Sequence, residues 1–287
     1  MTAYKLILTP LAEVSDASVT LETALRLGGL FQSHVKVLHV RPDPTSAIPM
    51  IGEGLSGVMV DEMINAADTQ GREVTSKVRA VYDEVLRRLD IPEAGQPLAR
   101  LSASWTEKLG REDDEVCHLA RVSDLVVLPT PDPDFDGVAS LTVNAVLLEG
   151  GRPVLLAPKV LPATIGTRIA IAWNGSAEGA RAVSDALPLL QQAKLVTVLH
   201  VTEEEGGLIS AQELVDYLAW QGVTADIHAV SPKGHGAGET LVAAATDWQA
   251  DLLVMGAYTH SRLRQLIMGG VTRHVLHHAK MPVLLSH

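Results

Sequence analysis

The sequence repeats four apolar segments, in the same order, in its two halves. The pairs are VKVLHV and VTVLHV, SDLVVLP and ADLLVMG, KLILTP and RIAIAW, and RPVLLAP and MPVLLSH. An ordered repeat at nearly constant offsets indicates a duplicated structural unit. A length of 287 residues also suits two domains better than one. We therefore expect one domain over residues 1–160 and a second over residues 161–287, divided near the segment KVLPATIG.

Within the second half, short β-branched runs alternate with segments whose apolar residues have helical spacing. We expect strands at residues 168–173, 195–201, 225–230, 251–257 and 282–286. The intervening helices are expected within residues 175–193, 210–222, 238–250 and 271–280. Strands that alternate with helices pair in parallel through right-handed crossovers. The predicted fold is therefore α/β, with a doubly wound parallel sheet in each unit.

The composition argues against some classes of binding partner and favours one cellular compartment. Hydrophobic residues make up 47% of the chain but aromatic residues only 3%, which favours aliphatic, buried parallel sheets. A net charge of −11 argues against nucleic acid and anionic membranes as main partners. No apolar run approaches the length of a membrane span, and the start MTAYKLILTP does not have the pattern of a signal peptide. With Cys117 as its single cysteine, the chain fits a reducing cytoplasm.

Ligands of doubly wound sheets bind at the carboxyl ends of the strands, where the strand order reverses. In the second unit this rule brings residues 172–174, Val201 and Gly256 toward one crevice. Gly256 ends a predicted strand, and the segment GGVT (269–272) opens a predicted helix. Glycines let a phosphate approach the backbone, and a helix N-terminus favours its charge. The alternative is that these glycines only end a strand and cap a helix.

The repeated unit resembles the universal stress protein family, and the whole chain resembles its tandem form. Nucleotide-binding members carry G-x2-G-x9-G-(S/T), whose backbone amides hold the phosphates of ATP. Gly256 and Gly269 match the first and third glycines of this motif, Thr259 stands at the second, and Gly270 stands at the Ser/Thr position. The resemblance implies two Rossmann-like, adenine nucleotide α-hydrolase-like domains, related by a pseudo-twofold axis as an intramolecular pseudo-dimer.

The resemblance also implies an adenosine site. The segment AWN falls where the family has a segment that ends in Asp and meets adenosine, and Val201 matches a position that touches adenine. Asn174 therefore replaces an acid, and Thr259 carries a Cβ at a glycine position. The implied nucleotide-binding residues are Ala172, Trp173, Asn174, Val201, Gly256, Thr259, Gly269, Gly270, Val271 and Thr272. The implied ligand is ATP or ADP, with or without Mg²⁺, and no catalytic residue or metal ligand is assigned.

The first unit differs at the corresponding place. Pro129 stands at the first glycine position, and Pro131 and Pro133 remove further amide donors. Aspartates at 132, 134 and 136 would repel a triphosphate, and no Gly or distal Glu completes a calcium loop. We expect a solvated acidic turn and a scaffold role for this unit. Its segment 41–63, with glycines at 52, 54 and 57, has no counterpart in the second unit. We expect a mobile flap that covers a crevice or contacts a partner chain. The alternative is a plain connection to a helix over 64–90.

Other reactive side chains favour structural roles. Cys117 lies in a helical pattern among acids and is expected to be a buried small residue. His274 and His278 share a helix face, but a solvated helix end is favoured over a metal site. His39 and His200 occupy matching places in the repeats and are expected to be structural.

Three functions are compatible with the sequence. The favoured one is a stress-response or signalling protein that binds one nucleotide in its second unit. The alternatives are a nucleotide-free scaffold that acts through protein contacts and a slow ATP hydrolase, and homodimerisation is left open. Each repeat also ends in an apolar strand that would invite association if left bare. In the family that the chain resembles such strands pair across the domain interface, so the resemblance implies that residues 154–157 lie antiparallel to residues 283–286.

Overall fold

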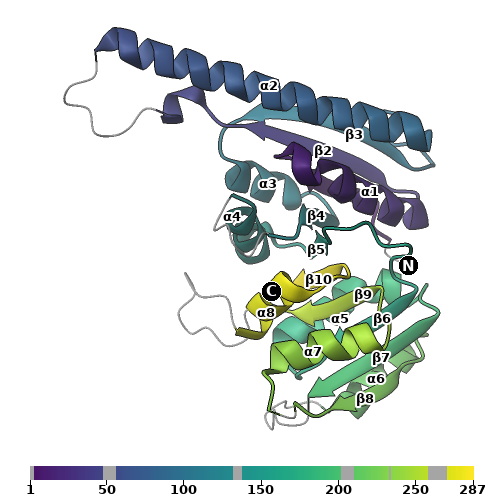
Figure 1. Ribbon diagram of the computed structural model, residues 1–287. Coiled ribbons are helices and arrows are strands. Elements are labelled where there is room, and N and C mark those ends of the chain that lie inside the picture. Colours follow the sequence, from purple (N-terminus) through teal and green to yellow (C-terminus); the bar gives the residue numbers. More distant parts are fainter. Residues whose placement is uncertain (1–2, 48–55, 132–137, 202–209, 233, 258–269) are drawn as a thin grey trace.

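The computed structural model describes residues 3–47, 56–131, 138–201, 210–232, 234–257 and 270–287 (Figure 1). Their strands form one continuous ten-stranded sheet in the order β3-β2-β1-β4-β5-β10-β9-β6-β7-β8. The strands of the first unit are β1 (Leu6–Pro10), β2 (His34–Arg41), β3 (Ser102–Leu109), β4 (Leu125–Pro129) and β5 (Val154–Ala157). Those of the second are β6 (Arg168–Ala172), β7 (Leu195–Val201), β8 (Asp226–Val230), β9 (Leu252–Gly256) and β10 (Val283–Ser286).

Helices cover both faces of this sheet (Figure 1). The first unit contains α1 (Val14–Phe31), α2 (Gly57–Leu89), α3 (Glu112–Ala120) and α4 (Val138–Ala145), with short turns at Pro44–Ala47 and Val146–Gly150. The second contains α5 (Ala177–Leu190), α6 (Ala211–Trp220), α7 (Ala237–Asp247) and α8 (Gly270–His278). One buried cluster joins the sheet to α1, α2, α5 and α6, and the other joins it to α3, α4, α7 and α8. The doubly wound α/β prediction is confirmed in both units.

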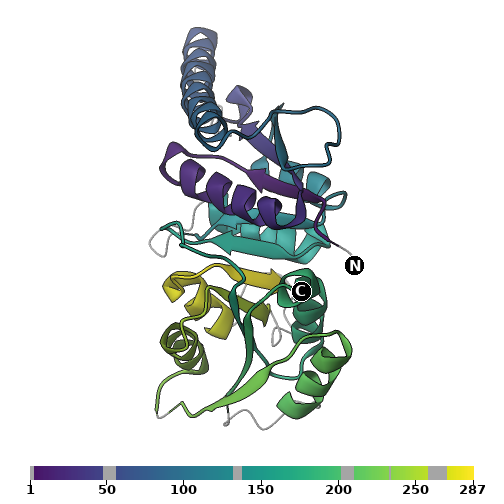
Figure 2. The ribbon, with the colours of Figure 1, turned by 90° about the vertical axis from the view of Figure 1, so that its right-hand side faces the viewer.

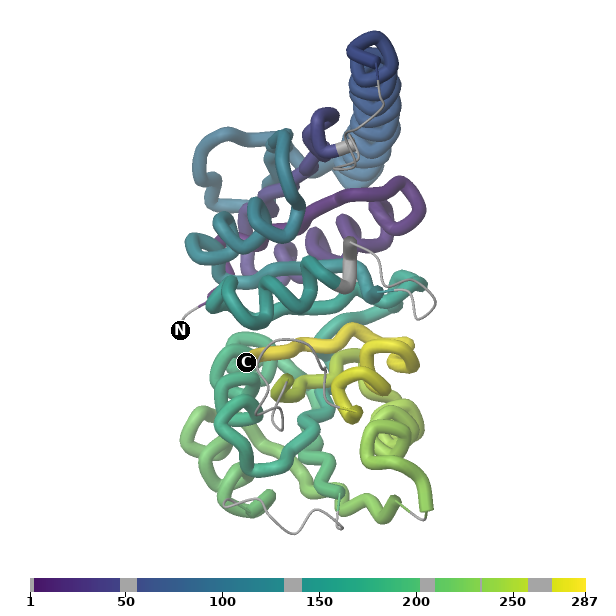
Figure 3. Tube along the Cα trace, turned by 90° about the vertical axis from the view of Figure 1, so that its left-hand side faces the viewer, coloured from purple at the N-terminus to yellow at the C-terminus, as the bar shows by residue number. Residues whose placement is uncertain are grey.

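The two units meet through β5 and β10, which pair antiparallel. Leu284 lies opposite Leu155, while the other strand pairs of the described sheet are parallel. The predicted pairing of residues 154–157 with 283–286 is therefore confirmed. Both strands are fully buried, so the apolar edges that the repeats leave at their ends cover each other. Figures 2 and 3 show the units one above the other with this pair between them.

The long helix α2 begins earlier than the sequence pattern predicted. It starts at Gly57 rather than near residue 64, because Ser56 caps it by accepting a hydrogen bond from the Met59 amide at 3.3 Å. Gly57 is thus the first helical residue and not part of a flap. The remaining glycines of the predicted flap, at 52 and 54, lie outside the described residues. The N-terminal end of α2 projects beyond the sheet (Figure 1).

Side chains also connect the units away from the central strand pair. Arg26 of α1 donates to the backbone oxygens of Pro162 and Ala163, in the segment between β5 and β6. The predicted boundary at residue 160 falls in this same segment.

None of the described helices reaches both the length and the hydropathy of a membrane span.

Candidate functional site

The strand order of the second unit reverses between β6 and β9. Strand β6 pairs with β7 on one side and β9 on the other, and its last residue, Ala172, lies opposite Leu199 and Met255. All three strands run in parallel, so their carboxyl ends lie at one edge of the sheet. The residues that the structure brings to this edge are Ala172, Trp173, Asn174, Val201 and Gly256.

These residues point to two different faces of the sheet. Ala172 and Val201 are buried in the cluster that contains α7 and α8. Trp173 is buried in the opposite cluster beside α5, and its amide donates to the Leu199 oxygen at 3.0 Å. The face shared by Ala172 and Val201 is therefore apolar, and the Trp173 ring belongs to the core under α5.

Asn174 builds the turn that leads into α5. Its Oδ1 accepts a hydrogen bond from the Ser176 amide at 3.2 Å, across Gly175, which has a φ of +71°. Ser176 is the N-cap of α5, and its hydroxyl accepts from the Gly179 amide at 3.0 Å. An aspartate at 174 would accept the same amide hydrogen bond, so the replacement of the acid keeps the turn and removes a negative charge.

Gly256 is a glycine because α5 lies against it. A Cβ at this position would stand 2.5 Å from the Gly179 amide nitrogen and 2.6 Å from the Glu178 carbonyl carbon. No side chain fits there without moving the first turn of α5. Packing against α5 alone therefore accounts for a glycine at the end of β9.

The N-terminus of α8, in contrast to the closely packed Gly256, is exposed. Gly270, the first described residue of this helix, is exposed, and a Cβ there would meet none of the described residues within 4 Å. Val271 is half-buried and Thr272 is buried. The first amides of a helix have no partner within it, so this end carries donors and partial positive charge. Thr259 and Gly269, which the sequence also assigned to this site, lie outside the described residues.

The corresponding edge of the first unit is acidic. Pro129 ends β4, and the Thr130 amide and hydroxyl both donate to the Ala157 oxygen, at 3.0 and 2.7 Å. Burial, and next the charge of Glu13, raises the pKa of Asp16 to about 6. Burial also raises the pKa of Glu112, whose Oε1 accepts from the Thr142 hydroxyl at 2.9 Å.

These two carboxylates could not be found from the sequence. Asp16 and Glu112 stand in the first turns of α1 and α3, where acids are common N-terminal residues and carry no distinctive signal. The fold brings the two carboxylates close enough that the charge of Asp16 contributes to the raised pKa of Glu112. Residues 132–137, with the aspartates that the sequence placed at this edge, lie outside the described residues.

The cysteine and the first repeat histidine have the structural roles expected of them. Cys117 is buried in α3, and burial, followed by the charge of Glu149, raises its pKa to about 11. His39 is buried, with Nδ1 2.6 Å from the Leu11 oxygen and Nε2 3.0 Å from Thr75 Oγ1. A carbonyl only accepts, so we assign the proton to Nδ1. His200 differs: its Nδ1 is buried and has no hydrogen-bond partner within the described part of the chain.

The histidines of α8 form a stacked pair. The rings of His274 and His278 have centroids 4.1 Å apart, and His278 Nδ1 lies 2.9 Å from the His274 carbonyl oxygen. No group of three or more metal-ligating side chains is found among the residues that the structure describes.

Comparison with known proteins identifies relatives of the second unit and of the whole fold. Residues 167–287 match the family model "Universal stress protein family". A universal stress protein of Synechocystis sp. (strain ATCC 27184 / PCC 6803 / Kazusa) is 32% identical over 142 residues, which are 46% of this chain and 46% of that protein. The match thus spans about half the length of the curated relative.

Solved structures match nearly the whole chain. A universal stress protein from Archaeoglobus fulgidus DSM 4304 has a TM-score of 0.63 at 16% identity, covering 98% of this chain and 97% of that one. A Pseudomonas aeruginosa UCBPP-PA14 protein, assigned to the universal stress proteins, has a TM-score of 0.58 at 17% identity, covering 99% and 93%. At such identities these matches show a shared fold.

Proposed function

Because residues 167–287 match the universal stress protein family, we propose that the C-terminal unit binds an adenine nucleotide, ATP or ADP, in stress response or signalling. The open N-terminus of α8 carries the proposal. Its first described residue is Gly270, where a Cβ would meet no described residue within 4 Å, so nothing in the described part of the chain blocks phosphate oxygens from the first amides of the helix.

The adenosine end of the proposed site is apolar. Ala172 and Val201 lie on the same face of the sheet as α8, in the cluster that also contains Leu199 and Met255. The adenine base and the phosphates of a nucleotide could therefore lie along this face of the sheet, from the ends of β6 and β7 to the start of α8. Asn174 brings no negative charge to this edge, and this favours a polyanion.

Two of the residues that the resemblance implies for nucleotide binding are proposed to shape the site without contacting the ligand. Gly256 and Trp173 hold α5 against the sheet, on the face opposite to Ala172 and Val201. Their proposed role is to fix the shape of the strand ends, and the ligand contacts fall to α8 and to the apolar face. Thr259 and Gly269 remain proposed ligand contacts of the backbone.

One nucleotide per chain is proposed, since the edge of the first unit is unfavourable for phosphates. Asp16 and Glu112 are partly desolvated carboxylates there, and the Thr130 amide already donates to the Ala157 oxygen. A triphosphate would face like charges and would find this amide occupied.

Mass spectrometry of the protein purified under native conditions, together with thermal unfolding, tests the proposal. A co-purifying adenine nucleotide is expected in no more than one copy per chain. Added ATP at about 100 times its Kd should raise the free energy of unfolding by about 2.7 kcal/mol. Neither a co-purifying nucleotide nor a thermal shift with ATP, ADP or AMP would favour the nucleotide-free scaffold.

A slow ATP hydrolase is the second candidate. Asn174 stands where the family has an acid, and an amide neither accepts a proton at neutral pH nor binds Mg²⁺ as a carboxylate does. We therefore expect binding without turnover, and phosphate release from ATP over hours by the purified protein would overturn this part of the proposal.

A further inference from the structure

A pocket of about 360 Å³ lies in the first unit, between α2 and the strands β2 and β3. Its lining includes three arginines, Arg41, Arg72 and Arg79, together with Trp105 and one acid, Glu107. Pockets of this volume are at the lower end of those that hold small molecules. We propose that it binds a small phosphorylated organic molecule.

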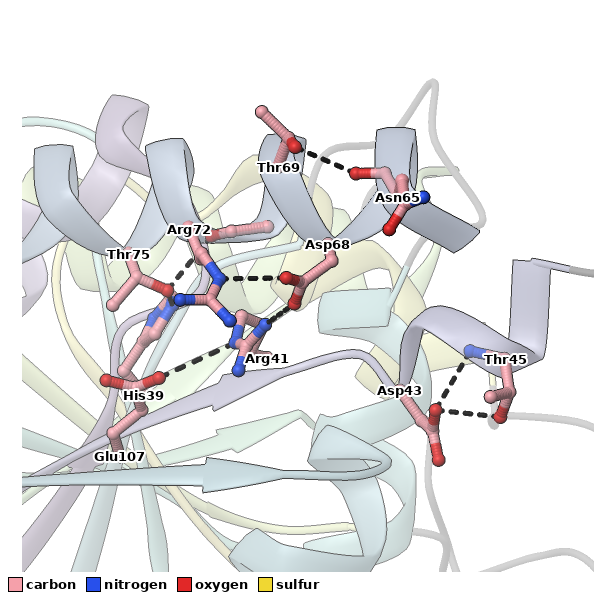
Figure 4. A network of polar contacts seen from close by, with 11 residues as sticks. His39, Arg41, Asp43, Thr45, Asn65, Asp68, Thr69, Arg72, Thr75 and Glu107 are labelled. Atoms are coloured by element: carbon pink, nitrogen blue, oxygen red, sulfur yellow. Dashed lines mark hydrogen bonds and ion pairs between the residues drawn. The ribbon is translucent and has the colours of Figure 1, made fainter. Parts of the chain in front are cut away.

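Two of the arginines are held in place by one carboxylate. Asp68 of α2 accepts hydrogen bonds from Arg41 Nη1 and from Arg72 Nε, the latter at 2.8 Å (Figure 4). The hydrogen bonds from Arg72 and then Arg41 lower the pKa of Asp68, so it stays ionised. Asp68 is thus a positioning residue that brings the two guanidinium groups together.

Arg41 is incompletely satisfied by the protein. Its side chain is mostly buried at the end of β2, and its Nε has no hydrogen-bond partner among the described residues. Glu107 Oε1 lies 3.5 Å from this nitrogen, as an ion pair (Figure 4). Arg41 Nε is therefore ion-paired with Glu107 but donates no hydrogen bond to a described residue, and an oxygen of a bound molecule could accept one.

The helix is adapted to Arg41 as well. A Cβ on Gly71 would lie 3.1 Å from both Cγ and Cδ of Arg41, which is closer than nearly all such contacts. Glycine within a helix lowers its stability, and exposed ion pairs such as Arg72 with Asp68 add little. The missing Cβ of Gly71 therefore leaves room for Arg41 under α2, and a side chain held in place in this way is what a binding site requires.

Some guanidinium nitrogens of Arg72 and Arg79 are available to donate hydrogen bonds to a phosphate. Arg72 uses only Nε for Asp68, and Arg79 uses Nε for Asp83 at 2.9 Å and Nη2 for Glu93 at 3.1 Å. Arg72 therefore keeps both terminal nitrogens, and Arg79 keeps Nη1, without a hydrogen bond to a described residue. Arginine binds carboxylates and phosphates through paired donors. Because three guanidinium groups surround this pocket, a dianion with several oxygens matches it better than a planar carboxylate.

Trp105 gives the pocket an apolar wall. Its ring is stacked on His39, with centroids 5.6 Å apart and planes 18° apart, and Arg79 Cζ lies 5.4 Å from its centroid. His39 is itself fixed by Leu11 and Thr75. A rigid aromatic wall beside the guanidinium groups suits an organic phosphate, whose carbon part it can contact, better than inorganic phosphate.

The pocket belongs to the first unit and is separate from the proposed nucleotide site. Its helix residues lie in the middle of α2, whereas the corresponding helix after β7, α6, spans only Ala211–Trp220. Binding here and binding at α8 can therefore succeed or fail independently.

Calorimetry with phenyl phosphate on the full chain tests the proposal. We expect one saturable site in the wild type, and Arg72→Gln and Arg41→Gln should each weaken binding by about tenfold or more, as the loss of charged hydrogen bonds predicts. Arg111→Gln is the matched control, because the side chains of Arg72 and Arg111 are both 72% exposed and both pair with an aspartate. Gly270→Glu should leave this binding unchanged.

Three results would overturn the proposal. They are the absence of saturable binding, an equal loss in Arg111→Gln, and unchanged binding by Arg72→Gln. Because Arg72 is exposed, its variant is expected to fold even if Arg41→Gln does not. Sodium benzoate should bind more weakly than phenyl phosphate, and equal affinity would contradict the assignment of a phosphate.

Discussion

The hydroxyl of Tyr4, in the first unit, donates a hydrogen bond to the backbone oxygen of Asp185, in α5 of the second unit, at 2.5 Å. Asp185 also accepts from Ser286 of β10, through Oδ2 at 2.8 Å. The Tyr4 ring is buried edge-on against Phe31, with centroids 5.2 Å apart. A single residue of α5 therefore joins the start of the chain to its last strand.

Removal of the Tyr4 hydroxyl should weaken this connection. Tyr4→Phe keeps the packing against Phe31 and is expected to lower the free energy of unfolding by about 1 kcal/mol, the typical value of one hydrogen bond. Urea denaturation followed by circular dichroism measures it. Tyr217→Phe, at an exposed position of α6, should have no effect. Equal stability of the two variants would show that the Tyr4 hydrogen bond contributes nothing.

Asp16 should make stability depend on pH. Its pKa is raised to about 6 in the fold, mainly by burial, from an ordinary value of 3.8. Between these values the folded state binds more protons than the unfolded state, so stability should fall as the pH rises from about 4 to 6. Glu112, whose pKa is also raised, acts in the same direction.

The variant Asp16→Asn should reduce this dependence and stabilise the protein at pH 7 relative to the wild type. Urea denaturation at several values between pH 4 and pH 7 would measure both effects. Asp114→Asn, which removes an exposed carboxylate of α3, is the control and should leave the slope unchanged. A slope in Asp16→Asn as steep as in the wild type would contradict the assigned cause.

Gly256 should not tolerate a side chain. Its Cβ would overlap the first turn of α5, so we expect Gly256→Ala to lower the free energy of unfolding by about 1–3 kcal/mol, as overpacking does. Gly270→Ala is the matched control, since its Cβ would meet open space. Thermal unfolding of both variants tests this, and a Gly256→Ala midpoint equal to that of Gly270→Ala would refute it.

Much of the fold was predictable because local patterns determine it. Strand β7 has the bounds expected from LVTVLHV. The apolar ends of the repeats indicated strands that need a partner, and the family resemblance supplied the antiparallel pairing of β5 with β10. The start of α2 was missed, because Ser56 followed by Gly57 resembles a loop until the helix beyond it is known. A capping side chain overrides the weak helix propensity of that glycine.

The sites were less predictable, since they depend on contacts distant in sequence. The glycine pattern indicated Gly256 but not that α5 occupies the space beside it. Arg41 and Glu107 come from neighbouring strands that α2 separates along the chain, so nothing local links them to Asp68. The pairing of strands and the path of one helix create this pocket, and neither follows from spacing alone.

Titration calorimetry of ATP into the wild type, Gly270→Glu and Gly270→Ala tests the central claim most directly. An acid at a helix N-terminus favours the helix, so Gly270→Glu should be at least as thermally stable as the wild type. The same carboxylate would repel phosphates, so this variant should lose ATP binding. We expect one site per chain in the wild type and in Gly270→Ala, and no measurable binding in a folded Gly270→Glu. Two equivalent sites per chain, or unchanged binding by Gly270→Glu, would contradict it.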